Sequence, residues 1–168
     1  TLAGTNAGNY IKPVDGTNAT GVITTIQLTI AAPTLTLTKP YDGNTTAVVT
    51  AGALSGILGG DVVTVSAVSN YDTSAVGASK TITTVYTLGG AQAGNYIKPV
   101  NGTNATGIIT QKQLTIAAPT LTTTKPYDNN TTAAVTAGTL SGIVGAEVVT
   151  VSAVATYDTK DVGTSKTI

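Results

Sequence analysis

Residues 61–68 read DVVTVSAV, and this stretch decides the fold class because apolar and small polar side chains alternate along it. In an extended chain Val63, Val65 and Ala67 fall on one face, and the Thr and Ser between them fall on the other. Alternation with period two is the pattern of a half-buried β-strand. Residues 80–88, KTITTVYTL, are rich in β-branched side chains and predict a second strand.

Turn-forming residues separate these two strands from others along the chain. Asn101-Gly102 and its counterpart Asp15-Gly16 belong to the dipeptides favoured in two-residue hairpin loops, so we expect a hairpin at each. Residues 22–30 also alternate and are predicted to be extended. About six to eight short strands per module favour an all-β fold of two packed sheets, of the immunoglobulin-like kind.

The chain repeats itself with an offset of 86 residues, so that residues 1–82 align without a gap on residues 87–168. Roughly three-quarters of the aligned positions are identical, and no shorter period of the solenoid type is visible. The sequence therefore predicts tandem immunoglobulin-like β-sandwich modules with a repeat of 86 residues. We expect the chain to be a tile from a longer array of such modules.

One substitution places the boundary between modules. Lys112 in the second copy replaces Ile26 in the middle of an apolar run, which indicates that this position is exposed. We therefore predict the end of one module at 1–25, a complete module at 26–111 and the start of the next at 112–168. A single long strand is expected to close one module and open the next, which would make the array semi-rigid.

The composition excludes several classes of partner. Eight basic and eight acidic residues leave no net charge and no basic face, so nucleic acid is not an expected partner. No apolar run reaches the roughly 18 residues that a membrane-spanning helix needs. Without Cys, His, Phe, Trp or Met, the core must be built from seven Tyr and from aliphatic side chains.

The usual catalytic groups are also missing. With neither His nor Cys, the chain has no common general base and no thiol nucleophile. Ser79-Lys80 and Ser165-Lys166 are sequence neighbours, which places their side chains on opposite faces of a strand. The acidic residues are scattered over turns and strand ends. We therefore expect no catalytic residue, no metal and no cofactor.

Several motifs follow one another in a fixed order within one module. They are KPYDGNTTA (39–47), LSGILGGDVVTV (54–65), YDTSAVGASKTI (71–82), LGGAQAGNY (88–96) and GIIT (107–110). In this order they resemble the bacterial YDG-type repeat, which is found in the stalks of large secreted fibrillar adhesins and haemagglutinin-like exoproteins. The resemblance covers the whole chain and implies an extracellular, non-enzymatic spacer.

The repeat takes its name from a turn. The predicted structural turns of the two copies comprise Tyr41, Asp42, Gly43, Tyr127, Asp128 and Asn129. Gly and Asn tolerate a left-handed backbone best, so Gly43 and Asn129 are expected to have positive φ. The change from Gly to Asn, like that from Asp61 to Glu147, argues against a strict chemical requirement at these positions.

A calcium site is one alternative to a purely structural turn. Asp42, Asn44 and Asp61 carry the hard oxygen ligands that calcium prefers, and they lie near glycine turns. The competing explanation is that these side chains form Asx turns with their own backbone.

An isopeptide crosslink is a second chemical hypothesis. Lys80 and Asn95 with Asp61, or Lys166 with Glu147, have the residue types of a Lys–Asn crosslink. The competing explanation is that these are ordinary exposed lysines and a turn asparagine.

Surface recognition would need exposed aromatic, amide or hydroxyl groups. A stacking platform for sugars would use tyrosines that are otherwise expected in the core: Tyr10, Tyr41, Tyr71 and Tyr86. Sequons for glycosylation fall on predicted turns at Asn18, Asn44, Asn104, Asn129 and Asn130. The Thr-rich strands would suit ice binding only as a flat regular array, and the absence of a short repeat disfavours one.

The function predicted from the sequence is mechanical. We expect a stalk or filament module of an extracellular fibrillar adhesin, whose partners are neighbouring copies of the repeat assembled head to tail. In such an assembly, residues 112–168 of one chain would take residues 1–25 of another as missing strands. The alternative is direct adhesion to a glycan, protein or ice surface through an exposed Thr-rich face.

Overall fold

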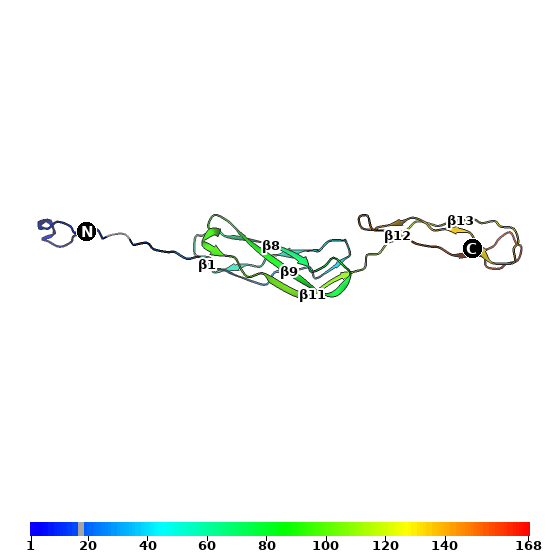
Figure 1. The fold of residues 1–168 in the computed structure, drawn as a ribbon, viewed down its shortest axis with the longest axis horizontal. Helices are drawn as coiled ribbons and strands as arrows, with labels where there is room; N and C mark the ends of the chain where they lie inside the picture. The colour runs from blue at the N-terminus through cyan, green and yellow to red at the C-terminus, as the bar shows by residue number, and fades with distance from the viewer. Residues whose placement is uncertain (17–18) are drawn as a thin grey trace.

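The computed structural model describes residues 1–16 and 19–168 and gives an elongated molecule (Figure 1). Within these residues the helical structure consists of two short 3₁₀ turns, η1 (Ala7–Asn9) and η2 (Ala93–Asn95). All other regular structure there is β-strand, so the all-β prediction is confirmed.

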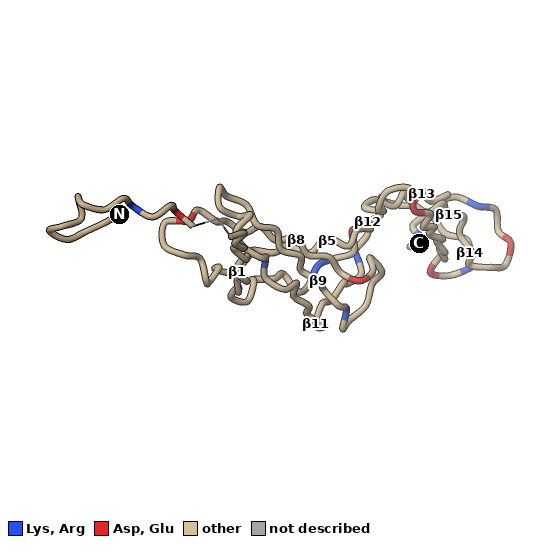
Figure 2. The backbone as a smooth tube through the Cα atoms, turned by 60° about the vertical axis from the view of Figure 1, so that its left-hand side comes forward, with Lys and Arg blue, Asp and Glu red and all other residues tan. Residues whose placement is uncertain are grey.

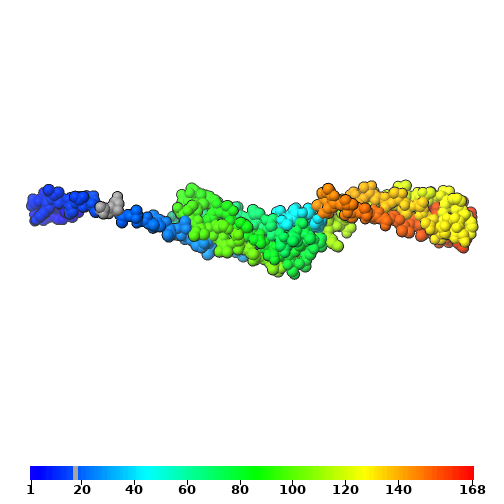
Figure 3. Space-filling model, viewed as in Figure 1, coloured from blue at the N-terminus to red at the C-terminus, as the bar shows by residue number. Residues whose placement is uncertain are grey.

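The strands fall into two groups along the chain. We call residues 26–111 the central unit, residues 112–168 the C-terminal unit and residues 1–25 the N-terminal segment; these limits follow the predicted modules, which remain a prediction. The N-terminal segment and the C-terminal unit leave the central unit at its opposite ends (Figure 3).

The central unit is built on a five-stranded sheet. In sheet order its strands are β4 (Thr38–Pro40), β11 (Gly102–Thr110), β9 (Gly77–Gly89), β8 (Thr64–Tyr71) and β5 (Thr46–Ala47). β8 and β9 pair antiparallel from Thr64 opposite Gly89 to Tyr71 opposite Ile82. These are the two strands that residues 61–68 and 80–88 predict.

Three short ladders run beside this sheet. They pair β1 (Ile26–Gln27) with β10 (Tyr96–Ile97), β2 (Thr29–Ile30) with β7 (Leu54–Ser55), and β3 (Thr34–Leu35) with β6 (Val49–Thr50). Leu35 of β3, together with Leu37 and Tyr41 on either side of β4, packs against a buried cluster of Ala47, Tyr71, Ile82 and Ile109. The hydrophobic core therefore lies between the short ladders and the five-stranded sheet.

Every second side chain of β9 faces this core, as a period of two requires. Lys80, Ile82, Thr84 and Tyr86 are buried. The hydroxyl groups of Thr84 and Ser69 lie 2.7 Å apart and satisfy each other by a hydrogen bond. The two polar side chains therefore fit in the interior without an unpaired group.

The hairpin predicted at Asn101-Gly102 is wrong. β10 pairs with β1, whereas β11 pairs with β9 and β4, so the chain changes sheets between Ile97 and Gly102. The long-range pairing of β11 overrides the local turn preference. No hairpin occurs at Asp15-Gly16 either, because the described residues of the N-terminal segment contain no strand.

The C-terminal unit repeats the ladders of the central unit at shifted positions. Its ladders pair β12 (Thr115–Ile116) with β16 (Leu140–Ser141), β13 (Thr120–Leu121) with β15 (Val135–Thr136), and β14 (Thr132–Ala133) with β17 (Ala155–Thr156). Thr115 opposite Ser141, for example, corresponds to Thr29 opposite Ser55. Equal sequences in the two units thus adopt equal strand registers.

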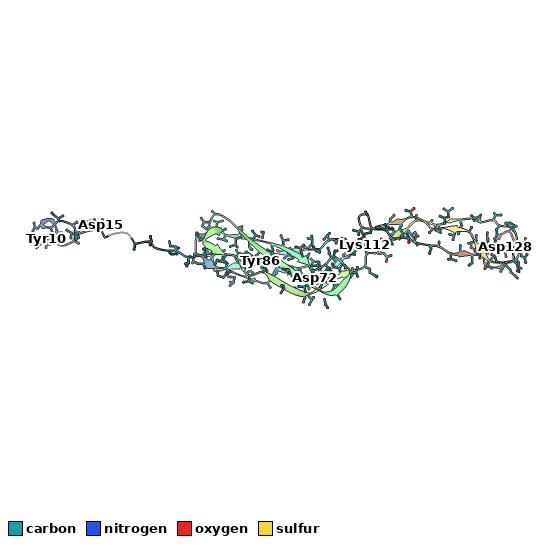
Figure 4. The ribbon with its side chains drawn as sticks, viewed as in Figure 1. Tyr10, Asp15, Asp72, Tyr86, Lys112 and Asp128 are labelled. Atoms are coloured by element: carbon teal, nitrogen blue, oxygen red, sulfur yellow. The ribbon has the colours of Figure 1, made fainter. Side chains whose placement is uncertain are left out.

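The connection between the two units is short. β11 ends at Thr110 and β12 begins at Thr115. Lys112 is exposed within this connection, as the sequence predicts, and Figure 4 places it where the two units meet.

Candidate functional site

The YDG turn has the backbone that the Gly and Asn alternation predicts. The φ angle is +79° at Gly43 and +61° at Asn129. Both values lie in the left-handed region, which Gly adopts without cost and Asn adopts more readily than other residues.

The side chain of Lys39 holds the YDG turn together by hydrogen bonds. The Lys39 ammonium donates to Asp42 Oδ1 at 2.7 Å, to the Asn44 carbonyl at 2.9 Å and to Asn44 Oδ1 at 2.8 Å. It also lies 5.6 Å from the centre of the Tyr71 ring, a cation–π distance. We call this arrangement the lysine clamp.

The C-terminal unit contains a second lysine clamp. Lys125 donates to Asp128 Oδ1 at 2.8 Å and to both Asn130 oxygens at 2.9 Å, and it lies 5.5 Å from the Tyr157 ring centre. Charges of both signs are spread along the molecule, and Asp128 lies near its C-terminal end (Figure 2, Figure 4). Our sequence reasoning missed both clamps, although a Lys three residues before an Asp is a recognisable signal.

The clamp argues against the calcium hypothesis. The oxygens of Asp42 and Asn44 that would bind a cation already accept hydrogen bonds from Lys39. Asp61 lies elsewhere and accepts a 2.5 Å hydrogen bond from the Tyr96 hydroxyl. Within the described residues, no group of three or more His, Cys, Asp or Glu side chains could hold a metal ion.

The clamps make stability depend on pH. The hydrogen bond from Lys39 holds the pKa of Asp42 below its usual value, and Lys125 does the same for Asp128. A carboxyl whose pKa is lowered by folding stabilises the fold above its unfolded-state pKa, and this contribution is lost as the pH falls through the folded-state pKa. We therefore expect the melting temperature to decrease when the pH is lowered below about 4. Circular dichroism melts from neutral to acid pH measure this.

A double substitution isolates the contribution of the clamps. Asp42→Asn with Asp128→Asn should give a weaker fall of melting temperature in acid. The matched control Asp15→Asn lies in a segment whose described residues form no strand, and it should behave as the unaltered chain. Asp72 still contributes to the pH dependence of this variant, because its pKa is also below the usual value. Desolvation raises the pKa of Asp72, but hydrogen bonds from the backbone N–H groups of Thr81 and Thr73 outweigh this effect and lower it. An unchanged pH dependence in the double variant would contradict the prediction.

The structure does not assemble the groups of an isopeptide crosslink. Lys80 is buried rather than exposed, and its ammonium donates to Thr73 Oγ1 at 2.5 Å, with Asp72 Oδ1 at 3.7 Å. Asp61 and Asn95 lie beyond the opposite end of the β8–β9 ladder. In the second copy Lys166 contacts Thr159 and Asp158, not Glu147.

The tyrosines divide between core and surface. Tyr71 and Tyr86 are buried in the central unit, as expected of core residues, and Tyr41 is half-buried against the core cluster. Tyr10 and Tyr127 are exposed. The four tyrosines considered for a sugar platform therefore do not share one surface.

The sequon asparagines occupy different environments. Asn44 and Asn130 hold the lysine clamps, and Asn129 Oδ1 accepts a 2.8 Å hydrogen bond from the Lys160 ammonium. Asn104 lies within β11 and not in the predicted turn. Asn18 lies outside the described residues.

The YDG turn also contacts the next unit. The Tyr41 hydroxyl donates a hydrogen bond to the Glu147 carboxylate, which raises the pKa of Tyr41. A Cβ atom at Gly43 would lie 2.9 Å from Val144 Cγ1. The turn at the end of the central unit is therefore packed on the loop before residue 148 of the C-terminal unit.

Two cavities mark the C-terminal unit. One of about 600 Å³ lies at the junction and is lined by Tyr41, Val76, residues 111–114, 142–144, Glu147 and Val149. The other, also about 600 Å³, is lined by residues 123–127, Tyr157, 159–166 and Ile168. No helix among the described residues is long and apolar enough to span a membrane.

The motifs, the turn and its second copy can be compared with known families. The sequence model of the YDG domain matches residues 23–105 and 110–168. The chain belongs to the YDG domain family. Each matched segment contains one YDG turn with its lysine clamp, so the resemblance expected from the motifs is confirmed. No curated protein and no solved structure matches the chain.

Proposed function

We propose that this chain is a structural stalk or filament module of an extracellular fibrillar adhesin or surface fibre. In this role tandem YDG domains supply reach and rigidity, neighbouring copies are the partners, and no reaction is catalysed. The observation that carries the proposal is the junction, where Tyr41 contacts Glu147 across a connection that runs only from Thr110 to Thr115. A short connection and a packed contact both limit bending between neighbours.

Each unit is, in this proposal, an immunoglobulin-like sandwich module of an 86-residue repeat. The five-stranded sheet facing short ladders supports the sandwich. The equal strand registers at shifted positions in the two units support the repeat. A load-bearing role needs such modules to be alike, because the weakest one limits the array.

Scattering in solution tests the proposed rigidity. We expect small-angle X-ray scattering of the dilute chain to report one elongated shape, with modules spaced roughly 50 Å apart if residues 26–40 run along the long axis at ~3.3 Å each. The control is a variant with a flexible Gly-Ser linker inserted after Gln111. If the chain and this variant scattered alike, the junction would be freely jointed and the stalk role would be lost.

Direct adhesion is the second candidate. The outer face of the β8–β9 ladder exposes polar cross-strand pairs such as Ser66 opposite Thr87 and Asn70 opposite Thr83. Specific retention of the chain on a glycan array, lost on Thr83→Lys, would favour adhesion by this face. Retention that Thr83→Lys leaves unchanged would count against it.

A further inference from the structure

Asn101-Gly102 is a sequence signal that the fold leaves unexplained. It is the sole Asn-Gly dipeptide of the sequence, and no hairpin forms at it. Gly102 does not have a positive φ. A Cβ atom on Gly102 would lie 3.6 Å from the Tyr86 hydroxyl and 3.8 Å from Thr84 Cβ, and both are ordinary contact distances. Neither the backbone conformation nor the space around residue 102 therefore requires a glycine.

The side chain of Asn101 has a cationic neighbour. The Lys98 ammonium donates a hydrogen bond to Asn101 Oδ1 at 2.6 Å, and both side chains are exposed. A hydrogen bond from a charged donor draws electron density from the amide carbonyl and stabilises negative charge that develops on its oxygen. The Asn101 Cγ atom is therefore a better target for a nucleophile than that of an isolated asparagine, and water reaches it.

The backbone after Asn101 supplies that nucleophile. The Gly102 nitrogen can bond to Asn101 Cγ and close a cyclic imide, a succinimide. A side chain on residue 102 would crowd this ring closure. Glycine has no Cβ and gives the backbone the most freedom, so ring closure is easiest when glycine follows the asparagine.

The first copy of the repeat carries the product of this chemistry. Asp15 aligns with Asn101, and Lys12 aligns with Lys98. The Lys12 ammonium lies 2.7 Å from Asp15 Oδ1 and 2.8 Å from Asp15 Oδ2. A carboxylate in place of the amide thus keeps the contact with the lysine and makes it an ion pair.

We propose that Asn101-Gly102 is a site of spontaneous deamidation, at which the contact of Lys98 with a neutral amide becomes an ion pair with a carboxylate. The Gly102 nitrogen loses its proton to hydroxide and attacks Asn101 Cγ. The side-chain amide nitrogen takes a proton from water and leaves as ammonia, and water then opens the succinimide. Overall, asparagine and water give aspartate and ammonia, with no oxidation or reduction. The modification adds a negative charge to a chain whose charges balance.

The succinimide opens at either of its carbonyl groups, and the two products affect the fold differently. Opening at the side-chain carbonyl restores an ordinary backbone. Opening at the backbone carbonyl gives isoaspartate, in which the main chain runs through the side chain and is longer. Before the site, Pro99 is buried and the Gln27 side-chain amide donates to the Lys98 carbonyl at 2.7 Å. After it, Gly102 pairs with Thr84, so the longer chain disturbs the start of β11.

Other asparagines of the chain serve as internal controls. Asn44 and Asn130 also accept a hydrogen bond from a lysine at Oδ1, at 2.8 and 2.9 Å. Each is followed by a threonine, whose β-branched side chain hinders ring closure. Asn104 lies within β11 and is followed by an alanine. The comparison separates the effect of the glycine from that of the lysine.

Peptide mapping of the aged chain tests the proposal. The folded chain is incubated at mildly alkaline pH, and its charge forms are separated by ion exchange and mapped by mass spectrometry. We expect a form with one more negative charge, modified at Asn101 well before Asn44, Asn104 or Asn130. Conversion at Asn101 no faster than at these three would overturn the proposal.

Two glycine variants test the ring closure. Gly102→Ala should fold, because its Cβ atom makes only ordinary contacts, and it should lose most of the conversion at Asn101. Gly94→Ala is the matched control, since a Cβ atom there meets nothing within 4 Å, and it should convert as the unaltered chain does. Equal conversion in the two variants would contradict a succinimide formed by the Gly102 nitrogen.

Two lysine variants test the activation of the amide. Lys98→Met removes the charged donor and should slow conversion at Asn101 several-fold. Lys98→Arg keeps a charged donor and should retain most of the rate. Equal rates in both variants would overturn the role given to Lys98.

The reaction must occur in the folded chain, because an unfolded Asn-Gly dipeptide also deamidates. The incubation is therefore repeated in urea, and conversion in urea without conversion in the folded chain would overturn the site. Hydroxylamine provides an independent measurement, since it cleaves the chain at a succinimide. The folded unaltered chain should be cut between residues 101 and 102, and Gly102→Ala should stay intact. A folded unaltered chain that stays uncut would count against the proposal.

Discussion

Replacing Tyr71 with Ala should lower the free energy of unfolding of the central unit by about 3–5 kcal/mol, the range for removing a buried aromatic ring. The ring is 3% exposed and lies in the cluster with Ala47, Ile82 and Ile109. Its hydroxyl donates a hydrogen bond to the Thr36 carbonyl at 3.3 Å, and the Lys39 ammonium lies over the face of the ring. The loss is comparable with the whole stability of a small domain. Urea unfolding followed by circular dichroism measures it.

The repeat supplies a control for this change. Tyr157→Ala removes the equivalent ring from the C-terminal unit, where it is only half-buried, and should cost clearly less in the monomer. Tyr41→Ala should also cost less than Tyr71→Ala, because Tyr41 is half-buried at the edge of the cluster. A ranking with Tyr41 first would show that the junction, not the core, dominates stability.

Replacing Ile109 with Ala should lower the free energy of unfolding by about 2–5 kcal/mol, as for other buried aliphatic residues. Ile109 is 1% exposed between the sheet and the short ladders. Ile23→Ala makes the same chemical change at a fully exposed site and should alter monomer stability by less than about 0.5 kcal/mol.

The pair of isoleucine variants therefore compares the same chemical change at a buried and at an exposed site. Urea unfolding followed by circular dichroism measures both variants. Equal effects of the two substitutions on monomer unfolding would mean that the N-terminal segment packs within its own chain.

Local patterns predicted the strands whose partners are their sequence neighbours. β8 follows from alternation and β9 from its β-branched side chains, and both signals are properties of each strand by itself. The positive φ at Gly43 follows from a residue preference and needs no knowledge of the fold.

Pairing between distant segments was not predictable in this way. Asn101-Gly102 has the chemistry of a hairpin, but β10 and β11 find better partners more than ten residues away. Lys80 was expected to be exposed because nothing local distinguishes a buried lysine, and its burial depends on Thr73 and Asp72 from the preceding loop. The contact of Tyr41 with Glu147 likewise depends on how two units meet.

The parallel pairing of β4 with β11 determines how the central unit responds to tension. A pull on the two ends of the central unit enters through the run that leads into β4 and leaves through the end of β11 at Thr110. Because the two strands are parallel neighbours, the pull slides one along the other. The Ile108 N–H bond to Leu37 and the Tyr41 N–H bond to Thr110, at 2.7 and 2.8 Å, are then strained together and not one after another. A strand pair loaded in shear resists rupture far better than one that is unzipped from its end.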